Sequence, residues 1–429
     1  MLWIPAYAGM TGWGTFYEFI KINYLRDDVK TQMEDQFVVS ILDDLTNQDQ
    51  GANVRQCIAE QGNALDWNYL IRKMSDEGIS SLFFYHIEQF NLQDLLPAGV
   101  YDVLSSEYYT NLRRNMLACT VLKPVFDKFN EQQIPFIVLK GIALAELVYP
   151  GFAMRGMSDA DILVKKDNVC MVDACLSALG YISRDSSVEQ ALDNPVGYLA
   201  SLDYQKSDGS LPNLHIHWHP VNTSVPAFMF AGQVDPDRLW EMAIHTEVAN
   251  AKARILCPEH QVIYLCEHAL RINHSFDRLI LIYDIFYVIS SLKYEIKWDF
   301  IIEEARRFNL SKLVFLSLTV VKHYTSLTIS EEIIRRLCSA DLTFGEKYFL
   351  NLQFKNRRFR GSSILVYLAM NEGFIEKCRF LLRTFFPPRQ ILMQRQYVKN
   401  GEFRIAYYVL RFREVLSHLF RIYRRQYKS

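Results

Sequence analysis

The sequence predicts an α+β fold in which a small mixed β-sheet lies between two helical regions. Apolar residues recur three and four positions apart through residues 33–132 and again from Pro258 onward, as on the buried face of a helix. Between these regions, short β-like runs alternate with helical stretches. We therefore divide the chain into a leader (1–32), an N-terminal helical region (33–132), a mixed core (133–256) and a C-terminal helical region (257–429).

The leader does not have the pattern of a structured segment. Its first fourteen residues lack the basic start and long apolar core of a signal peptide, and they resemble the read-through of a dispersed intergenic repeat. We expect residues 1–32 to be non-native or disordered, with Met33 as an alternative start.

Each later region has its own expected elements. Helical spacing is clearest at residues 70–90 and 101–129 of the N-terminal region. In the mixed core we expect strands at 136–139, 160–164, 198–204, 214–218 and 254–256, and a helix at 169–179 that stops before Gly180. Pro258 suits the first turn of the next helix, and Pro387-Pro388 divides the final helical stretch.

Asp159 and Asp161 form the most informative pattern in the chain. They stand two residues apart at the head of an apolar run, so on a strand both side chains point to one face. Two such anions repel each other unless a cation lies between them, and Mg²⁺ prefers carboxylate and phosphate oxygens. Removing one carboxylate should therefore leave the metal-free protein at least as stable.

The preceding residues complete a recognisable order. Leu139-Lys140-Gly141 reads as the end of a strand followed by a tight turn and a short helix, and Arg155 and Ser158 come just before the carboxylates. This ordered set resembles the nucleotidyltransferase superfamily related to DNA polymerase β, and most closely a bacterial family of uncharacterised nucleotidyltransferase-like proteins. Other features of this family resemble residues of this chain, namely Leu147-Val-Tyr-Pro150, His217-Trp218, His268, Arg278, Leu279 and Asp284.

The resemblance implies a palm-like catalytic core and an enzyme that transfers a nucleoside monophosphate from an NTP to the hydroxyl of a small-molecule or protein acceptor. It implies that Asp159 and Asp161 hold Mg²⁺ or Mn²⁺. Lys140, Gly141, Arg155 and Ser158 would then bind the nucleotide. Three alternatives stay open: a solvated strand edge for Asp159 and Asp161, a solvated strand end for Lys140, and a salt bridge to Asp159 for Arg155.

Two departures from the family pattern leave a second function open. Ile142 stands where a small residue usually follows the glycine, and His215 stands where a third carboxylate is expected. His215 suits a general base better than a Mg²⁺ ligand, and Asp203 is the nearest substitute carboxylate. The alternative is a degenerate relative that binds a nucleotide or a partner without turnover.

His215, His217 and His219 form a further pattern, with three imidazoles on one face of a strand. Such a comb can ligate Zn²⁺. The competing interpretation, which we favour because no Cys or acidic residue nearby completes a ligand set, packs His217 with Trp218 and leaves His219 at an exposed strand end.

Composition excludes several classes. With 47 basic and 48 acidic residues, the chain has no global field typical of a nucleic-acid binder, and we expect no sequence-specific nucleic acid as partner. Its eight cysteines show no Cys-x-x-Cys pair, and no apolar stretch reaches the ~18 residues of a membrane span, so we expect a cytoplasmic protein. The ordered motifs of protein kinases and the Walker loop are absent.

The end of the chain is basic, with 13 Lys and Arg residues against two Glu in residues 377–429. A helical stripe runs through it, formed by Ile405, Val409, Phe412, Leu416, Leu419 and Tyr423. We favour the interpretation that this stripe is core. The alternatives are weak contact with an anionic membrane surface and steering of an anionic substrate.

Overall fold

The fold was analysed in a computed structural model of the protein. It describes residues 52–62, 64–184, 200–221, 234–291, 295–338, 340–355, 360–371, 373–392 and 405–427, together with Glu34, Phe37, Val38, Val188, Leu192 and Arg358. The predicted leader, residues 1–32, lies outside the described residues, as does Met33.

A seven-stranded mixed sheet forms the centre of the protein and confirms the predicted α+β class. The strand order is β3-β4-β5-β2-β1-β7-β6. β2 pairs antiparallel with β1 and parallel with β5. The strands are β1 (Phe136–Val138), β2 (Asp159–Val164), β3 (Tyr181–Ser183), β4 (Ser201–Lys206), β5 (Asn213–His217), β6 (Ile244–Val248) and β7 (Ala251–Ile255).

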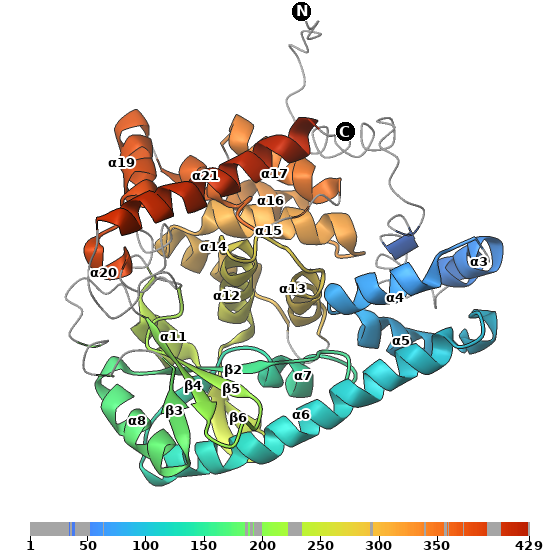
Figure 1. The fold of residues 1–429 in the computed structure, drawn as a ribbon, viewed down its shortest axis with the longest axis horizontal. Helices are drawn as coiled ribbons and strands as arrows, with labels where there is room; N and C mark the ends of the chain where they lie inside the picture. The colour runs from blue at the N-terminus through green and yellow to red at the C-terminus, as the bar shows by residue number, and fades with distance from the viewer. Residues whose placement is uncertain are drawn as a thin grey trace, which may run out of the picture.

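The N-terminal region is helical, as predicted. Its helices are α3 (Ala52–Gln61), α4 (Trp67–Asp76), α5 (Ser80–Gln89) and the 32-residue α6 (Val100–Glu131). Figure 1 shows α6 running along the lower edge of the molecule, from the N-terminal helices to the sheet. Within the mixed core lie α7 (Ile142–Leu147), α8 (Val169–Ala178) and α11 (Pro236–Met242).

The C-terminal region is also helical in its described residues. Pro258 occupies the first turn of α12, and α19 ends shortly before Pro387-Pro388, as the sequence predicts. The helices are α12 (Pro258–Leu270), α13 (Ile280–Ser290), α14 (Trp298–Arg307), α15 (Ser311–Tyr324), α16 (Glu331–Leu337), α17 (Phe344–Phe354), α18 (Ile364–Met370), α19 (Gly373–Phe385), α20 (Arg389–Leu392) and α21 (Ala406–Tyr427).

The two faces of the sheet differ because side chains alternate along each strand. One face packs against α6 and α8 through apolar side chains that include Ala160, Ile162 and Ile216. Asp161 and His215, which are paired neighbours in the ladder between β2 and β5, therefore lie on the other face. Leu163, on the same face as Asp161, packs in the apolar cluster that includes residues of α12 and α13.

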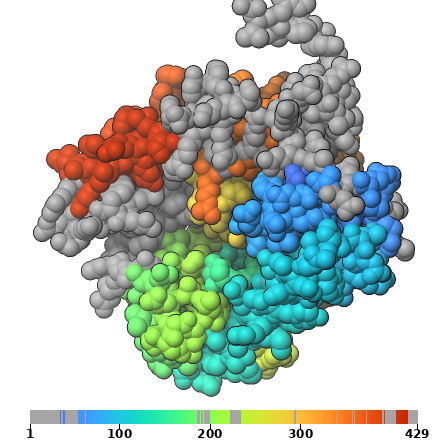
Figure 2. All heavy atoms as spheres, turned by 45° about the vertical axis from the view of Figure 1, so that its right-hand side comes forward, coloured from blue at the N-terminus to red at the C-terminus, as the bar shows by residue number. Residues whose placement is uncertain are grey.

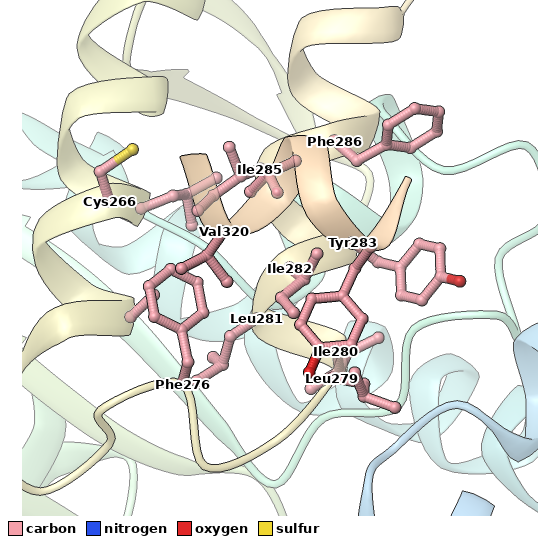
Figure 3. Close-up of a cluster of buried hydrophobic side chains, with 14 of the residues drawn as sticks. Cys266, Phe276, Leu279, Ile280, Leu281, Ile282, Tyr283, Ile285, Phe286 and Val320 are labelled. Atoms are coloured by element: carbon pink, nitrogen blue, oxygen red, sulfur yellow. The ribbon is translucent and has the colours of Figure 1, made fainter. Parts of the chain in front are cut away.

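A large apolar core joins the N-terminal helices, the sheet and the C-terminal helices. Figure 3 shows part of it, where Cys266 of α12, Val320 of α15 and the apolar residues of α13 meet. Phe84, Leu139 and Val262, one from each predicted region, belong to this same cluster. The boundaries at residues 132 and 256 remain a proposal for the chain's organisation.

The sequence analysis did not predict two of the strands, β3 and β6. β6 and β7 form a hairpin in which Val248 pairs with Ala251 across a two-residue turn at Ala249 and Asn250. Both turn residues have positive φ (52° and 55°), a geometry that usually calls for Asn-Gly or Gly-Gly. Because no glycine marks the turn, the hairpin has no strong signal in the sequence.

The interpretation of the C-terminal stripe as core is wrong for its described residues. Ile405 is 78% exposed and Val409 60% exposed, whereas Tyr407 and Val415 on the opposite face of α21 are buried. A sequence pattern identifies an apolar face but does not specify which neighbour covers it, so both faces of α21 were candidates. In Figure 2 the red residues of this helix lie at the edge of the molecule.

Candidate active site

Asp159 and Asp161 lie on the polar face of β2, at the floor of a cavity of about 820 Å³. The Asp161 side chain is 3% exposed and the Asp159 side chain 31% exposed. Their shared neighbours, Lys140 and His215, confirm that both carboxylates point to one side of the strand. One carboxylate is thus fixed within the protein and the other borders the open cavity.

Lys140 provides a cation beside both carboxylates. Its ammonium group forms an ion pair with Oδ2 of Asp161 and lies 4.0 Å from Oδ2 of Asp159. The backbone sets this position, since the N–H of Leu139 donates to the Asp161 carbonyl at 3.0 Å. Lys140 is only 6% exposed, so the alternative of a solvated strand end is wrong. The repulsion expected between the carboxylates is already offset by a cation of the protein itself.

His215 and His217 enter the site from β5. The ladder pairs Asp161 with His215 and Leu163 with His217. His217 Nε2 lies 3.0 Å from Oδ1 of Asp161, and His215 Nδ1 lies 3.6 Å from the same oxygen and 3.7 Å from Asp159 Oδ2. One carboxylate oxygen of Asp161 therefore faces two imidazoles, while the other faces Lys140.

Asp203 brings a further carboxylate to the group from β4, one strand beyond His215. In the antiparallel ladder between β4 and β5 it pairs directly with His215, and its Oδ1 lies 3.1 Å from His215 Nε2. The sequence singled out Asp203 without fixing its register. We call Asp159, Asp161, Asp203, His215, His217 and Lys140 the carboxylate–histidine cluster.

Burial and charge act in opposition within this cluster. Burial alone raises the pKa of Asp161, but Lys140 and hydrogen bonds from His215 and His217 outweigh it and hold the pKa well below its usual range. Burial likewise lowers the pKa of His215, yet Asp161, Asp203 and Asp159 together raise it above the ordinary histidine value. For His217 burial prevails and the pKa is lowered.

Gly141 makes the turn that brings Lys140 to the carboxylates. Its φ of 64° lies in the region that favours glycine, and an added Cβ would stand 3.4 Å from the Asp159 carbonyl oxygen. The next residue, Ile142, is fully buried in the core against α6, which explains a large side chain where the family has a small one. Ser158 lies beside Asp159, with 3.4 Å between Oγ and Oδ1.

Arg155 forms a different contact from the ones the sequence suggested. Its Nε and Nη2 donate to the two carboxylate oxygens of Asp284 on α13, at 3.2 and 2.9 Å, and its Nη1 donates to the Gly156 carbonyl at 2.9 Å. Tyr149 donates to the same carboxylate at 2.8 Å. The salt bridge to Asp159 considered from the sequence is therefore not the pair formed. We call Arg155, Asp284 and Tyr149 the Arg155–Asp284 cluster.

Basic side chains from the N-terminal and C-terminal regions also line the cavity. Lining residues that were not predicted as site residues include Arg114, Arg271, Asn273, His274 and Arg360. His268 and Arg278, which the family resemblance had singled out, line the same cavity. The rings of His268 and His274 lie 4.5 Å apart. No local spacing in the sequence links these positions to the carboxylates, because Arg114 belongs to another helix and the other positions lie more than 100 residues along the chain.

Asp161, His215 and His217 are the one group of three His, Cys, Asp or Glu side chains within the described residues whose arrangement could hold a metal ion. The expectation that no acidic residue completes the histidine comb is wrong, since Asp161 does so from the neighbouring strand. His219 has a different role: its two ring nitrogens lie 3.3 and 3.2 Å from the carbonyls of Val221 and Val234.

The protein thus has an α+β fold, and one face of its sheet carries Asp161, His215 and His217 in an arrangement that could hold a metal ion. A sequence model of the uncharacterised nucleotidyltransferase family matches residues 63–326, which is more than half of the chain. The protein therefore belongs to this nucleotidyltransferase family. No curated protein and no solved structure matches the chain significantly. Among the described residues, no helix is long and apolar enough to cross a membrane.

Proposed function

We propose that this protein transfers a nucleoside monophosphate from an NTP to a hydroxyl group of a small-molecule or protein acceptor, with release of pyrophosphate. The observation that carries the proposal is the carboxylate pair, Asp159 and Asp161, at the floor of a polar cavity in a chain of the nucleotidyltransferase family. We also propose that the family belongs to the superfamily related to DNA polymerase β, since strand, glycine turn, short helix and carboxylate strand follow in that order.

A divalent cation fits the residues present. Asp159 and Asp161 offer carboxylate oxygens beside the cavity, and the Lys140 ammonium group marks a position where positive charge is stabilised. When bound there, Mg²⁺ or Mn²⁺ would stabilise charge on the phosphates and on the attacking and leaving oxygens. Asp159, which is the more accessible of the two, is the ligand best placed to reach a nucleotide-bound ion.

The protein's own residues would bind and orient the nucleotide. Lys140 and Ser158 line the cavity next to the carboxylates, and Gly141 allows the chain to approach closely. Arg278, which is exposed and lines the same cavity, can pair with a polyphosphate. Arg155 also lines the cavity, and its contacts with Asp284 support a role in holding the segment before β2 in place.

His215 is the residue of the site best placed to handle a proton. It borders the cavity and is oriented by Asp203. A general base must be neutral before it can accept a proton, and the raised pKa of His215 means that the metal-free form loses its own proton only above the ordinary histidine range. A bound cation close by would lower that pKa and favour the neutral imidazole.

Two measurements test the proposal. Thermal-shift titration with each of the four NTPs, with and without Mg²⁺ or Mn²⁺, should show a metal-dependent rise in melting temperature for at least one nucleotide. A pyrophosphate-release assay with candidate acceptors should then show turnover, and mass spectrometry should identify the product. Absence of any metal-dependent nucleotide binding would overturn the proposal.

The second candidate function is that of a degenerate relative which binds a nucleotide without turnover. The observation that favours it is His215 in the place of the expected third carboxylate, with Asp203 one strand away. Metal-dependent nucleotide binding without pyrophosphate release, across a broad panel of acceptors, would support this function over the first.

We also propose that α19 and α21 contact an anionic membrane surface. Phe374 and Ile375 of α19 are 82% and 71% exposed, and Val409 of α21 is 60% exposed. Exposed arginines lie on the same helices, Arg379 and Arg383 on α19 and Arg413 on α21. Apolar side chains flanked by cations suit the interface of an anionic bilayer. The eight unpaired cysteines support the reducing cytoplasm as the compartment in which this contact would occur.

Vesicle sedimentation tests this contact. The protein should bind vesicles that contain phosphatidylserine more strongly than vesicles of phosphatidylcholine alone. The double substitution Phe374→Ser with Ile375→Ser should weaken the binding. Phe344→Ser is the matched control, because Phe344 is also 82% exposed but lies on α17. Equal loss of binding in the control would contradict a specific surface.

A further inference from the structure

We infer that Asp161, His215 and His217 form a binding site for a divalent transition metal, such as Mn²⁺, Co²⁺ or Zn²⁺, in preference to Mg²⁺. The inference deepens the proposed function and rests on it for the role of the ion. It replaces the general-base role of His215 with that of a ligand, because Nδ1 cannot bind a metal and accept a proton at once. Binding of the metal can be measured without any nucleotide. Four features of the cluster support it.

The first feature is the spacing of the donor atoms. Oδ1 of Asp161 lies 3.0 Å from His217 Nε2 and 3.6 Å from His215 Nδ1, and all three donors lie within 4.8 Å of one another. A transition metal bonded to nitrogen and oxygen at about 2.0–2.2 Å separates adjacent ligands by roughly 3–3.6 Å. The three side chains thus need little rearrangement to share one ion.

The second feature is that the two carboxylate oxygens of Asp161 have different partners. Lys140 pairs with Oδ2, so this oxygen is already neutralised by a buried ammonium group. Oδ1 faces the two imidazoles instead. An ion bound at Oδ1 therefore does not have to displace Lys140, whereas an ion between Oδ2 of Asp159 and Oδ2 of Asp161 would compete with it.

The third feature is the partner of His215. Its Nε2 lies 3.1 Å from Asp203 Oδ1, which leaves Nδ1 directed toward the other donors. Histidines that ligate metals usually donate their second N–H to a carboxylate, which fixes the tautomer and makes the ligating nitrogen more basic. Asp203, His215 and Asp161 stand in register on three adjacent strands, so the sheet itself builds this arrangement.

The fourth feature is the chemistry of the donors. Two imidazole nitrogens and one carboxylate oxygen suit borderline transition metals, whereas Mg²⁺ demands oxygen ligands. Asp159 remains at the cavity side of the cluster, where it can take part in binding a nucleotide-bound ion.

Calorimetry and spectroscopy on the full-length, metal-free protein test the site. Mn²⁺, Co²⁺ and Zn²⁺ alone, without nucleotide, should bind with one equivalent and at least about 100-fold more tightly than Mg²⁺. Pulsed EPR of the Mn²⁺ form should show coupling to imidazole nitrogen. Mg²⁺ binding as tight as Mn²⁺ binding, or a Mn²⁺ signal without nitrogen coupling, would overturn the inference.

Three variants and one control assign the ligands. His217→Gln and His215→Asn should each weaken Co²⁺ binding at least about 100-fold, and Asp203→Asn about 10–100-fold through its effect on His215. His245→Gln, an exposed histidine on β6 of the same sheet, should leave binding unchanged. If the His217 variant does not fold, the variants of His215 and Asp203 still test the site, because these two side chains are partly exposed. Unchanged Co²⁺ binding in folded His215→Asn would refute the site.

The outcomes also separate this inference from the proposed function. Metal-dependent NTP binding and pyrophosphate release in a protein without selective transition-metal binding would refute the metal site and leave the function standing. Tight Mn²⁺ or Co²⁺ binding through the histidines, without binding of any NTP, would refute the function and leave the metal site standing.

Discussion

The carboxylate–histidine cluster and the Arg155–Asp284 cluster differ in how completely their charges are satisfied. Both link the segment around β2 to a second element, β5 in one case and α13 in the other. In the Arg155–Asp284 cluster every guanidinium nitrogen donates a hydrogen bond of 3.2 Å or less to Asp284 or to the Gly156 carbonyl. The Tyr149 hydroxyl donates a further hydrogen bond to the Asp284 carboxylate. In the carboxylate–histidine cluster three carboxylates share one lysine and two histidines, with several separations of 3.6–4.0 Å.

This difference separates a structural site from a reactive one. A buried ion pair with all hydrogen bonds made can do little except hold two elements together. A cluster with more anions than fixed cations, placed at the floor of a cavity, has capacity left for an added cation or proton. The following predictions test that distinction, from the largest expected effect to the smallest.

The largest effect is expected from Asp159→Asn. It should abolish metal-dependent nucleotide binding while the free energy of unfolding of the metal-free protein stays the same or rises slightly, since Asp159 is the partly exposed anion of the pair. Thermal-shift titration with Mg²⁺-NTP and urea unfolding measure the two effects. Unchanged binding would remove Asp159 from the site.

Asp161→Asn should behave differently, which revises the expectation from the sequence. It leaves the buried Lys140 with Asp159 alone, 4.0 Å away, and should therefore destabilise the protein as well as impair binding. The charge-balanced pair Lys140→Met with Asp161→Asn should recover much of the lost stability. If the Asp159→Asn and Asp161→Asn proteins have equal free energies of unfolding, the ion pair between Lys140 and Asp161 does not stabilise the fold.

His215 is expected to give the second largest effect. His215→Ala should lower the transfer rate by about 10²–10⁴-fold with little change in NTP affinity if it acts as general base. If it only fills the place of a lost carboxylate, the parent should be slow or inactive, and His215→Asp should raise Mg²⁺ affinity and turnover. Rates of the parent, Ala and Asp proteins, compared side by side, decide between the two roles.

Substitutions in the Arg155–Asp284 cluster should lower the free energy of unfolding. Asp284→Asn leaves a buried guanidinium without its charged partner and should cost about 3–5 kcal/mol of unfolding free energy. The double variant Arg155→Met with Asp284→Leu should cost much less, because neither charge is then left alone. Urea unfolding checks both. A stable Asp284→Asn protein with impaired nucleotide binding would instead place Arg155 in the reactive site.

Acid sensitivity tests a group outside both clusters. Burial lowers the pKa of His86 from 6.5 to about 4, so above pH 6.5 this group adds no pH dependence. As the pH falls from 6.5 to 4, the unfolded chain takes up a proton that the folded protein resists, and stability should drop by about 3 kcal/mol in total. His86→Gln should flatten this window in pH-dependent unfolding. Asp161, whose pKa is depressed, should matter only at lower pH.

Much of the fold could be predicted because local chemistry fixes it. Helical spacing identified both helical regions, Gly180 and Pro258 marked helix ends, and five of the seven strands have clear β-like runs. The missed strands have weak local signals: β3 has three residues, and the turn before β7 uses Ala249 and Asn250 in place of glycine. The roles assigned to the site residues stay predictions until they are tested.

The sequence by itself determined the face on which the carboxylates lie, because alternation along β2 places Asp159 and Asp161 together whatever surrounds them. It also determined the glycine turn at Gly141, which positive φ requires. Only the tertiary structure decided that Lys140 lies between the carboxylates, that Asp203 and His215 share a register, and that Arg155 pairs with Asp284. The physical reason is that periodicity reports the direction of a side chain relative to its own backbone, whereas its partner is chosen by how separate strands and helices pack.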